Sequence, residues 1–284
     1  MNAGQETGVT AYLARLGLDE RPPATVETLT AIHQRHIEQI PYENLGAVLG
    51  AAPDIDAATT LARVAAGGNA GYCFHHNGLL TLVLRELGFN VVPAWGYPWG
   101  SEEGRRDRRV EHLALTVRGL PTDENPGGIW YPDVGCGDGI HAPLPLVTGE
   151  YRQGPFTYRL EVRDGEWTFF HDPKGSYTGA EIIDEELAPG QAEASHHRLT
   201  DPDGGPYTSH LIAQHRLPDA VEALRGCVFT RKADTIDRTE VTRYDDWRDA
   251  LHTVGVSFQD VDADALRGLF DRSLAAHREL QEAG

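Results

Sequence analysis

The fold class that this sequence predicts is α+β, and two observations predict it. In the first ninety residues, apolar side chains recur at helical spacing. From Phe89 onward the pattern changes to short, β-rich segments, and the last part of the chain mixes both types. Helices and strands that occupy separate parts of a chain are typical of an α+β protein.

The helical part contains three recognisable segments. From Thr25, apolar residues recur at helical spacing until Pro41 stops the run. We expect a second helix over residues 61–66. A third is expected to begin near Cys73 and to continue to Leu87, with Gly88 as its C-terminal cap.

The middle of the chain is expected to form an antiparallel sheet or barrel. Its β-rich segments are residues 89–95, 110–117, 129–133, 156–162 and 166–171. The Asp164-Gly165 step between the last two is a strong hairpin signal. Residues 184–207 have the composition of a connector. Further strands are expected at 227–232 and 240–244, and further helices at 246–253 and 263–282.

Length and charge exclude several classes of protein. A chain of 284 residues is too long for one small core and predicts two or three subdomains. The net charge of −18 argues against binding nucleic acid or anionic membranes. No window approaches 18 apolar residues, so we expect no membrane span, and the first residues do not have the pattern of a signal peptide.

The three cysteines, Cys73, Cys136 and Cys227, do not form a disulfide pattern. Their number is odd, their spacing is wide, and no CxxC pair for zinc occurs. We therefore expect a cytoplasmic protein with reduced thiols. The histidines show no recognised ligand spacing, so we expect no metal.

Cys73 stands out because the stretch GYCF (71–74) places it at the expected start of a helix. A thiol there lies near unpaired backbone N–H groups and the positive end of the helix dipole, which both favour the reactive thiolate. Gly71 permits a tight turn and close approach of a substrate. The alternative is a small buried thiol without a chemical role.

A nucleophilic cysteine needs a base and a group that orients the base. His112 is a polar residue in the mostly apolar stretch VEHLALTV, and Asp133 ends an aromatic strand where glycines begin. A carboxylate there could accept the imidazole N–H, fix its tautomer and stabilise the imidazolium. Cys73, His112 and Asp133 are thus the candidate catalytic residues, although a chain with 13 histidines would often supply such a set by chance.

Four segments, taken in order, resemble the arylamine N-acetyltransferase family. Residues 32–45 are similar to its helix ending in PFENL, and GYCF (71–74) to the core of RGGxCFE. VEHLAL (110–115) resembles its histidine strand, and WYPDVGCG (130–137) resembles DVGFG. The resemblance covers residues 30–165 well and the C-terminal third only loosely.

This resemblance implies three subdomains around a Cys–His–Asp core like that of cysteine proteases. They are a helical bundle (1–88) carrying the nucleophile, an antiparallel β-barrel (89–200) carrying the histidine and aspartate, and an α/β lid (201–284). It also implies ping-pong acyl transfer, in which Cys73 takes the acyl group of acetyl-CoA and passes it to an aromatic amine or hydrazine. Acetyl-CoA is then a substrate, and the partners are small molecules.

The sequence departs from the family pattern around the nucleophile. The arginine, first glycine and glutamate of RGGxCFE are Asn69, Ala70 and His75 here. An unpaired charge in a poorly solvated site is costly. We therefore hypothesise that Asn69 and His75 belong to one neutral network that replaces a charged pair and reaches Glu43.

Four further residues are expected to belong to the substrate pocket. Cys136 replaces the phenylalanine of DVGFG and is expected to reshape the acceptor pocket. Tyr42, Tyr72 and Phe74 are expected to line the substrate pocket, with simple packing as the alternative. A cluster of arginines precedes the His112 segment and belongs either to a solvated loop or to a site for the CoA phosphates; its members are Arg105, Arg106, Arg108 and Arg109.

Three other functions remain open at this point. An amide synthase of the ansamycin type, a relative in the same family, would take a thioester-bound polyketide chain onto Cys73 and release it with an arylamine. A papain-like or transglutaminase-like hydrolase would send the acyl group to water. A binding protein with a dead site would not need the intact triad.

Overall fold

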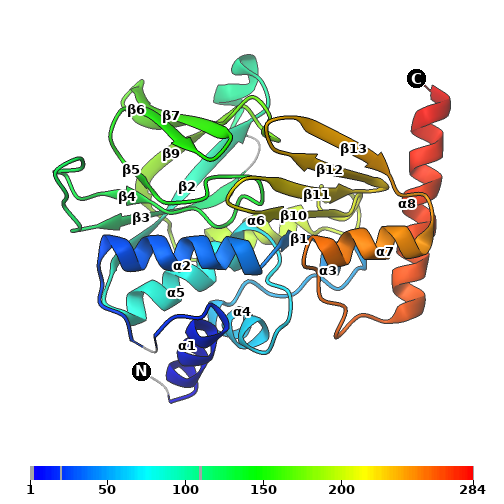
Figure 1. The fold of residues 1–284 in the computed structure, drawn as a ribbon, viewed down its shortest axis with the longest axis horizontal. Coiled ribbons are helices and arrows are strands. Elements are labelled where there is room, and N and C mark those ends of the chain that lie inside the picture. The colour runs from blue at the N-terminus through cyan, green and yellow to red at the C-terminus, as the bar shows by residue number, and fades with distance from the viewer. Residues whose placement is uncertain (1–2, 20, 109–110, 284) are drawn as a thin grey trace.

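Helices and strands occupy separate regions of the computed structural model, which describes residues 3–19, 21–108 and 111–283 (Figure 1). Its α-helices within these ranges are α1 (Ala3–Arg15), α2 (Val26–Gln39), α3 (Leu45–Val48), α4 (Ala57–Ala65), α5 (Cys73–Glu86), α6 (Gln191–Leu199), α7 (Tyr244–Thr253) and α8 (Ala263–Ala283). A short 3₁₀ helix, η1, covers Glu102–Asp107.

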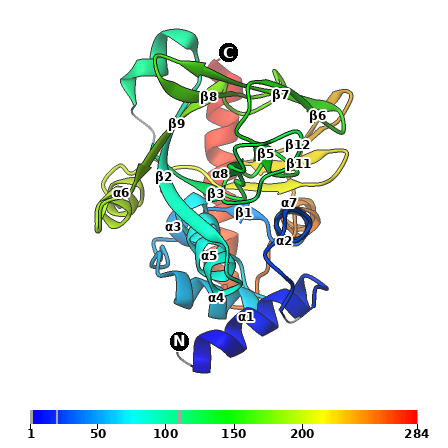
Figure 2. The same ribbon diagram turned by 90° about the vertical axis from the view of Figure 1, so that its left-hand side faces the viewer.

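The larger of two antiparallel sheets has the strand order β5-β4-β3-β2-β9-β8-β7-β6. Its strands are β2 (Asn90–Trp99), β3 (His112–Arg118), β4 (Trp130–Tyr131), β5 (Leu144–Pro145), β6 (Gly149–Gln153), β7 (Phe156–Arg163), β8 (Glu166–Phe170) and β9 (Gly179–Glu186). Figure 2 shows them arranged around a ring, as a nearly closed barrel. The predicted α+β class is confirmed.

The smaller sheet has the order β1-β10-β11-β12-β13 and brings distant parts of the chain together. Its strands are β1 (Tyr42–Glu43), β10 (Ile212–Arg216), β11 (Val221–Arg225), β12 (Val228–Lys232) and β13 (Ile236–Glu240). Tyr42 pairs with Gln214 across β1 and β10, and it also forms a parallel bridge with Gly71. The edge of this sheet therefore lies beside the turn that precedes Cys73. The division at residues 88 and 200 stays a prediction.

Local signals placed most helices correctly. The α2 helix begins after Thr25, whose side chain accepts the Thr28 N–H, and it ends before Pro41 as expected. The α5 helix spans the expected residues. The α4 helix begins four residues earlier than expected, because Asp56 caps it by accepting the Thr59 N–H at 2.7 Å.

The strands were predicted well in the middle of the chain and less well later. Asp164 and Gly165 both have positive φ in the β7–β8 turn, which confirms the hairpin. The β3 strand is described from His112, and Val110 lies outside the described residues. The connector expected at 184–207 is wrong, since it contains the end of β9 and helix α6. The strand expected at 240–244 is also misplaced, because β13 ends at Glu240.

Two apolar cores hold the helices against the sheets. In the first, α1, α2, α4 and α5 pack beneath β2 and β3 through buried side chains such as Leu29, Leu80 and Leu115. In the second, α7 and α8 pack against the smaller sheet around the fully buried Trp247. None of the helices within the described ranges combines the length and apolar character that crossing a membrane requires.

Candidate active site

Cys73 is the first residue of α5 and is almost fully buried. The turn before it requires glycine, because Gly71 has φ +120° and a Cβ there would lie 2.6 Å from His75 Nδ1. His75 Nδ1 in turn accepts the Tyr72 N–H at 3.3 Å. An imidazole thus fills the place that a glutamate or glutamine takes in a capping box.

A buried chain of side chains holds the carbonyl of the same turn. Tyr12 Oη lies 2.7 Å from His36 Nδ1, His36 Nε2 lies 2.7 Å from His76 Nδ1, and His76 Nε2 lies 3.1 Å from the Gly71 carbonyl. A carbonyl only accepts, so the direction of the chain is fixed: each group donates toward Gly71. Burial lowers the pKa of His36 and brings that of His76 to about 4, so both rings are neutral at pH 7.

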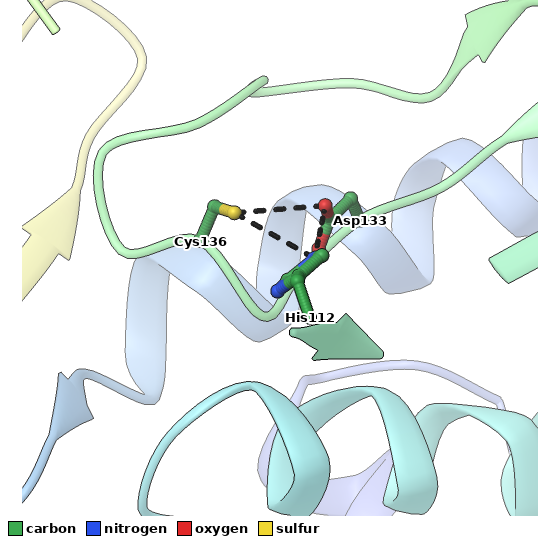
Figure 3. Close-up of side chains that lie close together, drawn as sticks. All are labelled: His112, Asp133 and Cys136. Atoms are coloured by element: carbon green, nitrogen blue, oxygen red, sulfur yellow. Dashed lines mark hydrogen bonds and ion pairs between the residues drawn. The ribbon is translucent and has the colours of Figure 1, made fainter. Parts of the chain in front are cut away.

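His112, the first residue of β3, pairs with Asp133 in the loop after β4 (Figure 3). His112 Nε2 lies 2.7 Å from Asp133 Oδ2, and both side chains are buried. The same oxygen accepts the Tyr131 hydroxyl at 2.6 Å, while Oδ1 accepts the Asn77 side-chain N–H at 2.8 Å and the Gly135 N–H at 2.9 Å. Both oxygens of the Asp133 carboxylate therefore accept hydrogen bonds.

The pair shifts both pKa values toward its charged forms. Burial is the largest single effect and would lower the pKa of His112, but the charges of Asp133 and Cys136 and the hydrogen bonds to both together outweigh it and hold that pKa well above its usual value. Burial alone would raise the pKa of Asp133, but the charge of His112 and hydrogen bonds from His112, Tyr131 and Asn77 hold it well below its usual value. Because Nε2 faces Asp133, Nδ1 is the nitrogen left to exchange a proton.

Cys73 and His112 line one cavity of about 120 Å³. Among the described residues, no hydrogen bond joins the Cys73 thiol to the imidazole. Gly135 packs closely against Cys73: a Cβ there would lie 2.9 Å from Cys73 Cα and 2.7 Å from Asn77 Nδ2. The loop that carries Asp133 is thus packed directly on the start of α5. The structure therefore brings the three predicted catalytic residues together.

The four predicted pocket residues separate into two pairs. Tyr42 and Cys136 line the cavity. Tyr72 and Phe74 do not: both are 1% exposed, and their rings pack edge-on against each other beside it. Substrate binding by Tyr72 and Phe74 stays a prediction that this cavity does not support.

Several residues of the cavity escaped the sequence analysis, among them Glu111, Tyr177, Tyr207 and Gln214. Tyr207 lies in the stretch expected to be a connector, and its hydroxyl accepts that of Tyr42 at 3.1 Å. Gln214 lies on β10, where the family resemblance is loose. The pairing of β10 with Tyr42 was the missing signal, and it is visible only in the folded sheet.

The hypothesis of one neutral Asn69–His75 network is wrong. The side chain of Asn69 exchanges two hydrogen bonds with the backbone of Ser257, at 2.9 and 2.7 Å. His75 bonds instead to Tyr72 and to the Pro53 carbonyl.

A positive charge is nevertheless present near this turn. Arg63 of α4 donates to the carbonyls of Asn69 and Ala70 at 2.9 and 2.8 Å. Its charge opposes the effect of burial on the Glu43 carboxyl, although burial is the larger effect and raises the pKa of Glu43 to about 7. The arginine lost from position 69 thus has a counterpart on a neighbouring helix.

The arginines before β3 form an ion-pair cluster. Arg105 lies 2.9 Å from Glu181 and 3.1 Å from Asp164, and Arg108 lies 2.6 Å from Glu166. Arg106 also contacts Asp164, whereas Arg109 lies outside the described residues. Because their carboxylate partners are in place, these three arginines give no support to a CoA-phosphate site here.

Comparison with known proteins shows the family to which the chain belongs. Residues 25–262 match the family model described as N-acetyltransferase. An arylamine N-acetyltransferase of Mycolicibacterium smegmatis is 34% identical over 170 residues, which are 58% of this chain and 60% of the relative. The arylamine N-acetyltransferase of Escherichia coli is 28% identical over 73% of this chain and 82% of its own length.

Solved structures agree with the fold. The M. smegmatis arylamine N-acetyltransferase superposes with a TM-score of 0.79 at 27% identity, covering 94% of this chain and 97% of that one. The Mycobacterium marinum enzyme, solved in complex with CoA, gives 0.80 at 23% identity over 94% of this chain and 98% of that one. At that identity the second likeness shows the fold alone.

We predict that Gly135→Ala lowers the free energy of unfolding by about 1–3 kcal/mol, because the new methyl group overlaps the Cys73 backbone. Denaturant unfolding measures it. Gly100→Ala is the matched control, since nothing lies within 4 Å of its Cβ and its φ is not positive. Equal stability of the two variants would contradict the close packing.

We predict that the free energy of unfolding of Glu43→Gln, relative to that of wild type, increases as pH rises. The folded-state pKa of about 7 lies above the ordinary 4.5, so the folded protein binds the proton more tightly and wild type loses stability between these two pH values. The glutamine variant has no such loss, so its advantage should grow by about 3 kcal/mol from pH 4.5 to 7. Unfolding curves at several pH values measure it, with the exposed Glu279→Gln as the control. A difference in stability between variant and wild type that does not change with pH would contradict the raised pKa of Glu43.

Proposed function

The chain belongs to the N-acetyltransferase family, and we propose that it transfers an acetyl group from acetyl-CoA to an aromatic amine or hydrazine through a thioester on Cys73. The observation that carries this proposal is the cavity shared by Cys73 and His112, with His112 held by the buried Asp133 carboxylate. Acetyl-CoA acts as a substrate, since the thiol itself carries the acyl group between two half-reactions.

In the first half-reaction, the Cys73 thiol gives its proton to His112 Nδ1, and the thiolate attacks the carbonyl carbon of the thioester. Asp133 stays ionised and stabilises the imidazolium that forms. The backbone N–H groups of α5 that precede those of His75 and His76, which both donate to the Tyr72 carbonyl, stabilise the oxyanion of the tetrahedral intermediate. The bond to the CoA sulfur then breaks, and His112 returns the proton to that sulfur.

In the second half-reaction, the amine nitrogen attacks the acetyl carbon of the Cys73 thioester. His112 accepts a proton from the nitrogen, and the Cys73 sulfur leaves as the amide forms. A small, buried cavity limits the access of water, which would otherwise hydrolyse the thioester.

The site draws on all three segments expected from the sequence. The nucleophile comes from 1–88, the histidine and aspartate from 89–200, and Tyr207 and Gln214 from 201–284. We therefore propose that the last segment closes the substrate cavity. The three free thiols fit a cytoplasmic enzyme acting on small molecules.

A second candidate, the amide synthase, draws on one observation. A hollow of about 590 Å³ lies next to the catalytic cavity and shares Ser176 and Tyr177 with it. Cys136 stands in the catalytic cavity where the family pattern has a larger aromatic side chain, and this cavity together with the neighbouring hollow offers room for a longer acyl chain or a bulkier amine.

We predict a single acetyl adduct on intact wild-type protein after incubation with acetyl-CoA, measured by mass spectrometry. Cys73→Ala should show none, and Cys227→Ala should match wild type, because Cys227 is buried in the core of α7 and α8. Added arylamine should discharge the adduct.

The other outcomes separate the candidates. No adduct, with Cys73 still rapidly alkylated, would contradict acetyl-CoA as donor and favour the amide synthase. A Cys73 thiol inert to both reagents would contradict the catalytic role.

A further inference from the structure

Cys136 takes no part in the reaction steps above, yet its thiol lies against the catalytic pair (Figure 3). Its Sγ is 3.7 Å from His112 Nε2 and 3.6 Å from Asp133 Oδ2. The side chain is half-buried and lines the cavity that contains Cys73. Sulfur, nitrogen and oxygen donors therefore converge within 4.8 Å of one another.

The separations suit a tetrahedral metal ion. Bonds of about 2.3 Å to sulfur and 2.0–2.2 Å to nitrogen and oxygen place the sulfur about 3.6 Å from each of the other two ligand atoms. The observed distances of 3.7 and 3.6 Å match this without movement of Cys136. Only the nitrogen–oxygen distance, 2.7 Å, must lengthen by roughly 0.7 Å, because a metal replaces the proton between these atoms.

We propose that His112 Nε2, Asp133 Oδ2 and Cys136 Sγ form a binding site for a thiophilic divalent cation of the Zn²⁺ type. One thiolate and one carboxylate balance the two positive charges. A thiolate–imidazole–carboxylate set favours zinc over calcium or magnesium, which prefer oxygen ligands. The fourth position remains for water from the cavity that His112 and Cys136 line.

A cation bound at this site prevents His112 from acting as the base. This consequence rests on the proposed function. A metal on Nε2 leaves the proton of the neutral imidazole on Nδ1, so this nitrogen can no longer accept a proton from Cys73. The metal also withdraws the Asp133 carboxylate from its role beside the ring. The cation is therefore a reversible inhibitor of the proposed reaction.

The site depends on a residue that departs from the family pattern. A phenylalanine at position 136, as in DVGFG, supplies no ligand atom, so we attribute this site to the cysteine of this chain. The competing location is Cys73, which lines the same cavity and could share His112 with a metal. A test must therefore separate the two thiols.

Cobalt(II) is a suitable probe, because a Co²⁺–thiolate bond gives a charge-transfer band in the near ultraviolet. We expect the band when CoCl₂ is titrated into wild type and into Cys73→Ala, and its loss in Cys136→Ala and in the nearly isosteric Cys136→Ser. A calorimetric titration with ZnCl₂ should show an affinity at least ~10-fold lower in both Cys136 variants than in wild type, since loss of even an outer-shell partner costs that much. Circular dichroism checks that each variant is folded.

Wild type and the two Cys136 variants also test inhibition by ZnCl₂, with each rate normalised to its own uninhibited value. We expect the inhibitory concentration to rise at least ~10-fold in Cys136→Ser. A band that survives in both Cys136 variants and disappears in Cys73→Ala would overturn the proposal, as would a wild type that develops no band. The cobalt measurement needs no substrate, so its outcome does not depend on whether the chain acetylates amines.

Discussion

The ion pair between His112 and Asp133 is the interaction on which the rest of the site depends. Burying a carboxylate is costly unless its oxygens are fully bonded. Here the donors come from three directions: Asn77 from α5, Tyr131 from the barrel, and Gly135 from the loop itself. Because bonds from these three elements meet on one carboxylate, they also fix the start of α5, the end of β4 and the loop relative to one another.

The other buried histidines show what that carboxylate does. His33 donates from Nδ1 to the His141 carbonyl and accepts the Asp133 N–H on Nε2, which requires a neutral ring. Burial lowers its pKa to about 4 and that of His75 to about 3. His112 is also buried, yet its pKa is raised, because unlike His33 and His75 its ring bonds to the Asp133 carboxylate and lies beside the Cys136 thiol. His33 and His75 are thus held neutral, whereas the carboxylate beside His112 stabilises a proton on its ring.

The sequence allowed the α+β class to be predicted, and it also identified Cys73, His112 and Asp133 as candidates that the fold brings together, because these depend on local signals and ordered motifs near residues 30–165. It could not show α6, whose sequence lacks a strong apolar stripe and is stabilised by tertiary contacts such as that between Ser195 and Glu111. It also could not show that Arg63 replaces the charge missing at Asn69, because the two residues meet only when α4 packs beside the turn. Gln214 and Tyr207 were missed for the same reason: strand pairing brings Gln214 beside Tyr42, and Tyr207 meets Tyr42 through a hydrogen bond between their hydroxyls.

The most direct test of the ion pair is the rate at which iodoacetamide alkylates Cys73 across a range of pH, in wild type and in Asp133→Asn. The exposed Asp164→Asn is the control. If Asp133 holds His112 as the proton acceptor for Cys73, wild type and control should react at neutral pH at least ~10-fold faster than Asp133→Asn, which should gain reactivity only at alkaline pH. Superimposable rate profiles for all three proteins would contradict the account.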